Sequence, residues 1–383
     1  MMPSQPVRRS ASLSRHSQSW AVSCVLSSGR IDGSPGASLF FSSPASNFHN
    51  FPPNYQVRKE TAMPRNQRDR RDPNIRVVHV TNRAWEGLPF VPNRSMRRMI
   101  KSVLARAQLL YPVTICAYLF MTNHYHMVLA GDANRVSLFM GYIDGEIAKR
   151  MKRFFPNRWG PKFWADRFKE QHLPTPDAVI NKIIYIFCNP MAARLVSKLS
   201  TYPGASSLAA LTSIDHKTSE LCSVTFPRWY KPLNTNYLSK KADFALSRDL
   251  HQKAEGFHEL RTDLFAWKRC FKEQICRSDA LLKITNSIAA AEEKAEALGV
   301  IGAKRLQYQA FDRQHSPEKK GRTPFIDCPD EKLRKILIAS YQNFRAACRR
   351  AWELVKRGLQ AEWPHGAFVP SRRWLDRIPI AAL

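Results

Sequence analysis

The feature that most restricts the fold is a pair of apolar stretches joined almost without a gap. Residues 113–121, VTICAYLFM, and residues 124–130, HYHMVLA, are separated only by a Thr-Asn pair. Two strands joined so closely form an antiparallel hairpin. Side chains alternate between the faces of a strand, so His124 and His126 point to one face and Tyr125 to the other. The sequence therefore predicts an antiparallel sheet with two histidines on one face.

Further elements are expected before and after the hairpin. The β-branched run at residues 75–82, IRVVHVTN, predicts an earlier strand. Apolar residues at helical spacing predict helices over residues 91–112, 134–156 and 175–190. Thr175 is a suitable N-cap for the last of these. The order strand, helix, strand, strand, helix, helix predicts an α+β fold, in which helices pack on one face of an antiparallel sheet.

The chain is expected to fall into three parts. Residues 1–74 are basic and rich in Ser, Pro and Arg; they have too little apolar surface to bury and are predicted to be disordered. Their composition is similar to that of an organelle transit peptide, and a start of translation at Met63 is the other interpretation. Residues 75–205 form the domain that contains the hairpin. Residues 206–383 are predicted to be a basic, mostly helical C-terminal region, because amphipathic spacing returns near its end.

The net charge indicates the kind of partner. The chain has 60 Lys and Arg against 31 Asp and Glu, which gives a formal charge of +29. A chain this basic is expected to bind a polyanion. Nucleic acid is favoured over a membrane, because no apolar run approaches the roughly 20 residues that span a bilayer. The eight cysteines include no CxxC pair, which argues against a disulfide framework or a cysteine-built zinc site and indicates a cytoplasmic protein.

The two histidines can form part of a metal site. Their imidazoles lie on one strand face, roughly 7 Å apart along the chain. In the helix predicted after them, Asn181, Tyr185 and Asn189 recur every four residues as a polar stripe. A metal ion would polarise a phosphate while the tyrosine attacks it. Taken separately, the tyrosine could be an aromatic residue at the edge of the core and Asn189 a helix C-cap. Their combination with the histidines favours the functional interpretation.

These motifs resemble those of a known family. The run AYLFMTNHYHMVL, followed by YIFCNPMAARLV, is similar to the REP-associated tyrosine transposases, a branch of the single-tyrosine HUH transposases of small insertion sequences. The similarity spans about residues 75–202. It implies a ferredoxin-like sheet in which His124, His126 and Asn189 bind Mg²⁺ or Mn²⁺. It also implies that Tyr185 cleaves single-stranded DNA and leaves a 5′-phosphotyrosine and a free 3′-OH.

Four positions depart from the family pattern. Thr122 stands where proline is usual and Ala84 where glycine is usual, while Ala192 and Arg194 replace an arginine and a glycine. None of them is one of the four residues assigned to the chemistry.

Three functions compete. The first is an enzyme of DNA transposition, a metal-dependent HUH single-tyrosine nuclease and strand transferase. The second is a catalytically inactive DNA-binding protein derived from such a transposase. The third, a relaxase or replication-initiator nickase, is disfavoured because the tyrosine here follows the histidines, whereas relaxase tyrosines usually precede them.

Basic residues on both sides of the predicted site suit a phosphate track. Trp159, Phe163 and Trp164 could stack unpaired bases, which favours single-stranded or hairpin DNA. The sequence leaves open whether the site is completed within one chain or by a second copy, and so whether the protein is a monomer or a homodimer. The candidate DNA-contacting residues are Arg83, Arg97, Arg98, Lys101, Arg150, Lys152, Arg153, Arg158, Lys162 and Arg167.

Overall fold

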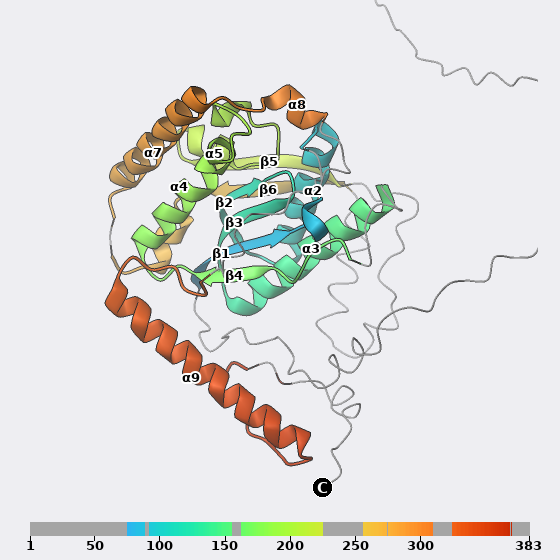
Figure 1. The fold of residues 1–383 in the computed structure, drawn as a ribbon, viewed down its shortest axis with the longest axis vertical. Helices are drawn as coiled ribbons and strands as arrows, with labels where there is room; N and C mark the ends of the chain where they lie inside the picture. The colour runs from blue at the N-terminus through green and yellow to red at the C-terminus, as the bar shows by residue number, and fades with distance from the viewer. Residues whose placement is uncertain are drawn as a thin grey trace, which may run out of the picture. The chain divides into compact units, whose positions relative to one another are not determined.

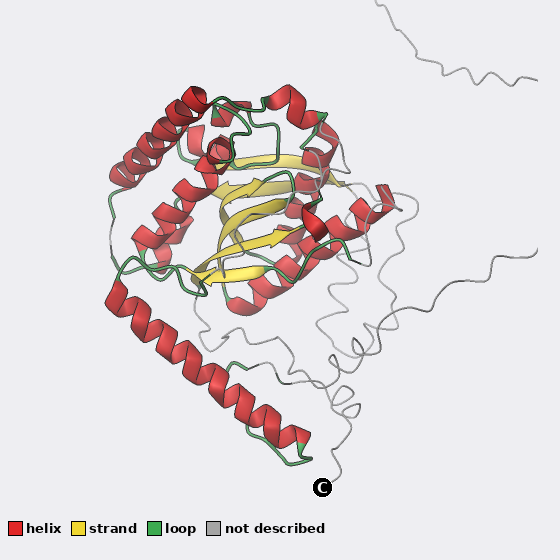
Figure 2. Cartoon of the chain, viewed as in Figure 1, coloured by secondary structure: helices red, strands yellow, loops and turns green. Residues whose placement is uncertain are grey.

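The structure is a computed structural model that describes residues 75–88, 92–154, 162–224, 256–273, 275–308, 324–367 and 369. The part predicted to be disordered, residues 1–74, lies outside the described residues. The described elements form an α+β fold built on one six-stranded sheet, as Figures 1 and 2 show. The predicted α+β class is therefore confirmed.

Four strands form the part of the sheet that the sequence motifs concern. They are β1 (Arg76–Arg83), β2 (Thr114–Phe120), β3 (His124–Gly131) and β4 (Lys169–His172). Their spatial order is β4-β1-β3-β2, with every neighbouring pair antiparallel. Together with the helices between them, they have the β-α-β-β-α-β order of a ferredoxin-like unit.

The hairpin predicted from the two apolar stretches is β2 and β3. Phe120 pairs with Tyr125, and the ladder continues to Thr114 opposite Ala130, with one register shift between Ile115 and Ala117. Every residue of both strands except the first of each is buried, because helices cover both faces of the sheet. This burial explains why the two strands are continuous apolar runs without a polar face.

Helices lie on both faces of the sheet, so the prediction that they all pack on one face is wrong. Helices α2 (Arg94–Leu110) and α3 (Ala133–Phe154) cover one face, where Tyr125 and Met127 enter the same hydrophobic core. Helix α4 (Pro176–Ala192) covers the other face and packs against Val128 and Ala130. Because alternate residues of β3 are apolar on both faces, each face needs its own cover.

The helix predicted over residues 175–190 begins and ends as follows. Thr175 accepts a hydrogen bond from the backbone N–H of Ala178, which confirms it as the N-cap. Pro190 does not end the helix, since α4 continues to Ala192 and the backbone N–H of Ala193 donates to the carbonyl of Asn189. Asn189 is therefore a residue of the last helical turn and not the C-cap.

The C-terminal region contributes two strands to the sheet, although its sequence predicts mainly helices. Strands β5 (Lys217–Val224) and β6 (Gly256–Asp263) form an antiparallel hairpin, and β6 joins the edge of β2 in parallel at Ile115 and Thr262. Residues on both sides of the expected boundary near residue 205 therefore share one sheet. Most side chains of β5 are exposed, so this strand lacks the apolar alternation that would have identified it.

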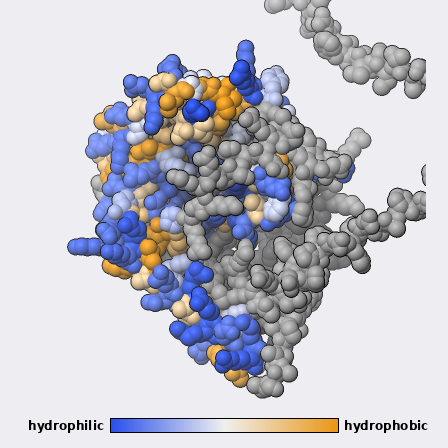
Figure 3. Space-filling view, in the orientation of Figure 1, coloured by the Kyte–Doolittle hydropathy of each residue, from blue (hydrophilic) through white to orange (hydrophobic). Residues whose placement is uncertain are grey.

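Helices and short turns complete the described part of the chain. Helix α7 (Arg277–Leu298) packs on α4, where Ile284 and Ile288 join the core of that face. Asp330 caps the N-terminus of the long basic helix α9 (Glu331–Lys356), along which Figure 3 shows mainly hydrophilic side chains. None of the described helices has the length and apolar character needed to cross a bilayer. The remaining short elements are η1 (Trp85–Gly87), η2 (Leu199–Thr201), α5 (Leu208–Thr212), η4 (Ala266–Cys270) and α8 (Ala303–Gln307).

Candidate active site

The two histidines and the tyrosine predicted from the sequence lie together. His124 and His126 stand at the start of β3 on the face that α4 covers, and their ring centroids are 4.9 Å apart. The ring of Tyr185, on α4, is 5.2 Å from that of His126 and nearly perpendicular to it. All three side chains belong to one chain. The structure thus brings the imidazoles and the phenol into a single site without a second copy.

Tyr185 is accessible to a large substrate. Its side chain is 48% exposed, although it neighbours a histidine that is only 6% exposed. The ammonium of Lys182, one turn earlier on α4, lies 5.2 Å from the centre of the tyrosine ring. Lys182 also forms an ion pair of 2.5 Å with Asp327, from the segment before α9. The phenol therefore stands at the rim of the site beside a positive charge.

Asn189 follows Tyr185 by one turn of α4, so the two side chains lie on the same side of the helix. Its amide nitrogen is buried and has no hydrogen-bond partner among the described residues. Buried amide groups are normally paired, and an unpaired N–H group needs an explanation such as a bound water or another acceptor. An amide nitrogen cannot bind a cation, so only the amide oxygen of Asn189 is a possible metal ligand.

His126 is uncharged and has one unpaired ring nitrogen within the described residues. Burial, followed by the nearby His124, His79, Lys182 and Arg83, holds the pKa of His126 well below 6.5. The ring is therefore neutral at pH 7, the form in which imidazole binds metals. Its Nε2 atom is buried and is unpaired within the described part of the chain.

His124 and His126 provide only two metal-binding side chains, so a divalent cation would also need the amide group of Asn189. Within the described ranges, no three His, Cys, Asp or Glu side chains gather closely enough to hold an ion. The two imidazoles from β3 supply nitrogen donors and the amide of Asn189 supplies an oxygen donor, and both donor types bind divalent metal ions. The donor types therefore fit a divalent cation, the class of group that the sequence resemblance implies.

A third histidine belongs to the site and was not predicted. His79 on β1 stacks on His126 with 5.2 Å between ring centroids, and its Nε2 is 3.0 Å from Nδ1 of His126. Its Nδ1 is 3.2 Å from the amide oxygen of Gln171 on β4. Burial first, and then Lys182, lowers the pKa of His79 to about 3. In the sequence His79 is a lone histidine among valines, and only the pairing of β1 with β3 brings it to His126.

Among the expected DNA contacts, Arg83 lies beside the histidines. It pairs with His124 across β1 and β3 and is partly buried, which lowers the pKa of its guanidinium. Arg97, Arg98 and Lys101 are on α2, which covers the opposite face, and Lys101 forms an ion pair of 2.5 Å with Glu220. The basic residues predicted to contact DNA therefore lie on both faces of the sheet.

The other expected contacts are dispersed. Arg150 is buried and lies 4.0 Å from Glu146, while Lys152 and Arg153 are at the end of α3. Lys162 is 4.5 Å from the ring of Trp85, and Arg167 is exposed. Arg158 and Trp159 lie outside the described residues.

Two aromatic residues expected to stack on bases are part of the core instead. Phe163 is 2% exposed and Trp164 is 8% exposed. The indole N–H of Trp164 donates to the backbone carbonyl of Asp144, and its ring packs edge-on against Tyr125. Both side chains pack in the hydrophobic core between the sheet and α3, so they cannot stack on bases.

One departure from the family pattern has a visible cost. Arg194, where glycine is usual, has a φ of 51°, in the left-handed region that favours glycine. Ala84 has an ordinary φ of −62° and is fully buried. The replacement at residue 194 therefore strains the backbone after α4, whereas the one at residue 84 does not.

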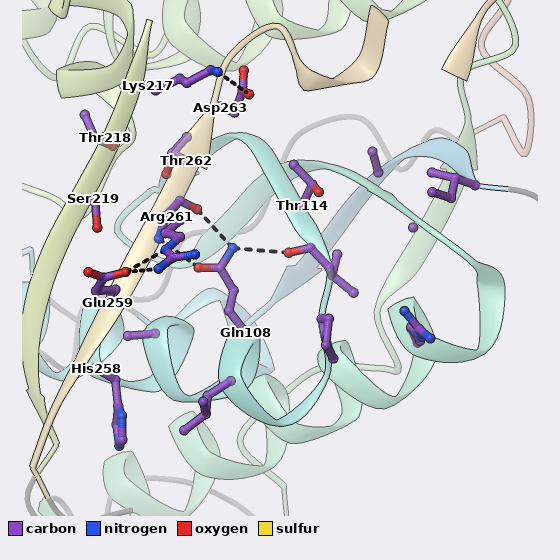
Figure 4. A pocket seen from close by; sticks show the side chains of 18 of the residues that line it. Gln108, Thr114, Lys217, Thr218, Ser219, His258, Glu259, Arg261, Thr262 and Asp263 are labelled. Atoms are coloured by element: carbon purple, nitrogen blue, oxygen red, sulfur yellow. Dashed lines mark hydrogen bonds and ion pairs between the residues drawn. The ribbon is translucent and has the colours of Figure 1, made fainter. Parts of the chain in front are cut away.

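A separate cavity of about 960 Å³ lies at the opposite end of the strands, near Gly131. In Figure 4, Gln108 reaches from α2 to the backbone of Arg261, with two hydrogen bonds of 2.9 Å. Charged groups around the cavity pair with each other, as Lys217 does with Asp263 at 3.7 Å. Because it lies away from the histidines and Tyr185, this cavity is distinct from the candidate active site.

Comparison with known proteins concerns the part of the chain that contains the hairpin. Residues 78–176 match the family model described as "Transposase IS200 like". A solved structure, "Structure of the REP associates tyrosine transposase bound to a REP hairpin", is 15% identical over 39% of this chain and 82% of that chain, with a TM-score of 0.27. No curated protein matches. The family model thus confirms, over residues 78–176, the resemblance to transposases that the motifs predicted. Tyr185 and Asn189 lie after the matched residues.

Proposed function

We propose that this protein is a metal-dependent single-tyrosine transposase that cleaves and rejoins single-stranded DNA associated with hairpins. The observation that carries the proposal is the 5.2 Å approach of the Tyr185 ring to His126, whose buried Nε2 has no partner in the described part of the chain. A structural histidine would have both ring nitrogens satisfied. An exposed phenol next to an unsatisfied imidazole fits a nucleophile beside a metal ligand.

In the proposed reaction, the phenol oxygen of Tyr185 attacks the scissile phosphorus. A bond forms between this oxygen and phosphorus, and the bond from phosphorus to the 3′ oxygen breaks. The phenol proton is lost, and the departing 3′ oxygen takes up a proton to become a hydroxyl, so the product is a 5′-phosphotyrosine. Attack by a 3′-OH on this linkage rejoins DNA and restores the phenol.

The residues around Tyr185 have separate tasks. His124, His126 and Asn189 would hold Mg²⁺ or Mn²⁺, which supplies charge stabilisation at the phosphate when bound. Lys182 places a positive charge beside the phenol ring, where it can offset the charge of an approaching phosphodiester. Arg83, next to His124 on the neighbouring strand, is placed to contact the DNA backbone. We infer that one chain completes the site, since all these residues come from it.

DNA is the proposed partner because of charge and family. The net charge of +29 favours a polyanion, and the resemblance favours hairpin DNA with a single-stranded segment. The alternative function, a DNA-binding protein without activity, predicts the same binding without a covalent product.

Trapping of the covalent adduct tests the proposal. The full-length protein is incubated with Mn²⁺ or Mg²⁺ and a panel of labelled single-stranded DNAs containing hairpins, and denaturing gels detect labelled protein. We expect an adduct with the unchanged protein and none with Tyr185→Phe. Tyr308→Phe is a matched control, because Tyr308 is also an exposed tyrosine. DNA binding without an adduct under either metal would refute the enzyme and support the inactive alternative.

A further inference from the structure

We infer that His79 and Gln171 are positioning residues that fix the tautomer of His126, so that its Nε2 lone pair is held ready for a ligand. The inference rests on the proposed function, because it gives these two residues a task in the same site. Neither residue is predicted from the sequence motifs, and neither contacts the DNA or the ion directly in the proposed arrangement.

The three side chains form a continuous row across three strands. Gln171 on β4 is paired directly with His79 on β1, and Thr81, two residues further along β1, is paired with His126 on β3. The amide oxygen of Gln171 is 3.2 Å from Nδ1 of His79, and Nε2 of His79 is 3.0 Å from Nδ1 of His126. All three side chains are buried. Strand pairing therefore holds the row in place.

The donor and acceptor of each hydrogen bond in this row follow from the chemistry of the three side chains. An amide oxygen can only accept, so Nδ1 of His79 must carry the proton and donate to it. A neutral imidazole has one N–H, which leaves Nε2 of His79 as an acceptor. Nδ1 of His126 must then donate to it, and Nε2 of His126 keeps its lone pair.

The last atom of the row is the one left unsatisfied. Nε2 of His126 is buried and has no hydrogen-bond partner within the described ranges. Hydrogen bonds of this kind behind a metal-binding imidazole fix its tautomer and orientation, and their loss typically lowers metal affinity by about 10- to 100-fold. The row explains how an unprotonated nitrogen can be maintained at this position before an ion arrives.

Substitutions can break the row at either link. His79→Phe keeps an aromatic ring stacked on His126 but removes the acceptor, while His79→Gln retains an acceptor oxygen. Gln171→Met has nearly the same shape as glutamine and lacks the amide oxygen. Gln108→Met is the matched control, because Gln108 makes comparable hydrogen bonds at the opposite end of the sheet.

The experiment measures Mn²⁺ affinity by calorimetry and the protonation of each imidazole nitrogen by ¹⁵N NMR, both on the full-length protein without DNA. We expect the unchanged protein to carry the proton of His126 on Nδ1. We expect Mn²⁺ affinity to fall about 10- to 100-fold in His79→Phe, to fall less in Gln171→Met, to be largely restored in His79→Gln, and to stay unchanged in Gln108→Met.

The outcomes separate this inference from the proposed function. A proton on Nε2 of His126 in the unchanged protein, or unchanged Mn²⁺ affinity in His79→Phe, would overturn the positioning role. If the Nδ1 proton is present in the unchanged protein and moves to Nε2 in His79→Phe, while no variant binds Mn²⁺, the row is upheld and the metal-dependent function fails.

Discussion

The two faces of the sheet treat neighbouring residues of β3 in opposite ways. Tyr125 and His126 are both buried. On the face under α3, the hydroxyl of Tyr125 donates to Asp144 at 2.7 Å, and Asn82 donates to the same carboxylate at 2.9 Å. On the face under α4, Nε2 of His126 has no partner among the described residues. At these two neighbouring residues, the hydroxyl on one face is paired, whereas the imidazole on the other face keeps an unpaired ring nitrogen that a ligand can use.

The largest expected difference between the two faces is in how the free energy of unfolding depends on pH. His79 has a pKa of about 3 when folded and 6.5 ordinarily, so below pH 6.5 the unfolded state binds a proton that the folded state excludes. This contribution is fully present above pH 6.5 and is lost progressively as the pH falls from 6.5 toward 3.

The test compares unfolding by urea at pH 7 and pH 5. We expect the unchanged protein to lose about 2 kcal/mol more than His79→Phe between these values. Tyr125→Phe, on the opposite face, should lose as much as the unchanged protein. An identical loss in His79→Phe would show that His79 is not held neutral by burial.

A smaller change in the free energy of unfolding is expected when the hydrogen bond of Tyr125 under α3 is removed. Tyr125→Phe removes one hydrogen bond to Asp144 and leaves its carboxylate less well paired, which should lower the free energy of unfolding by about 1–2 kcal/mol. Urea unfolding at pH 7 measures this loss. Adduct formation per folded molecule should remain within about twofold, because Tyr125 points away from Tyr185. A large loss of adduct in a folded Tyr125→Phe protein would contradict the separation of the two faces.

The smallest effect concerns DNA binding. Arg83→Ala should weaken binding to single-stranded DNA and reduce the slope of log affinity against log salt by about 0.7, the value for one lost phosphate contact. Lys101→Ala should leave both nearly unchanged, since Lys101 is on α2 and pairs with Glu220. Fluorescence anisotropy over a range of salt concentrations measures both quantities. Equal effects of the two variants would mean that the DNA does not favour the face under α4.

Local features of the sequence were sufficient to predict part of the site. The short connection of β2 to β3 identified the hairpin, and strand alternation placed His124 and His126 on one face. The four-residue spacing of Tyr185 and Asn189 on a capped helix predicted that these two side chains lie on the same side of that helix. Strand β4 was missed because KEQH has no apolar pattern. Phe163 and Trp164 were expected to contact DNA. They lie in the connection between α3 and β4, and the sequence of a connection does not show which of its side chains the rest of the fold buries.

The sequence by itself determined which side chains are proposed to react, because their types and spacing along one strand and one helix follow from local geometry. Only the tertiary structure decided that α4 crosses the face bearing the histidines, and that His79 and Gln171 stand in a row behind His126. These relations depend on strand order and register, which arise from packing between segments far apart in the chain. The addition of β5 and β6 to the sheet has the same origin, since an edge strand with exposed side chains is defined mainly by the backbone of its neighbour.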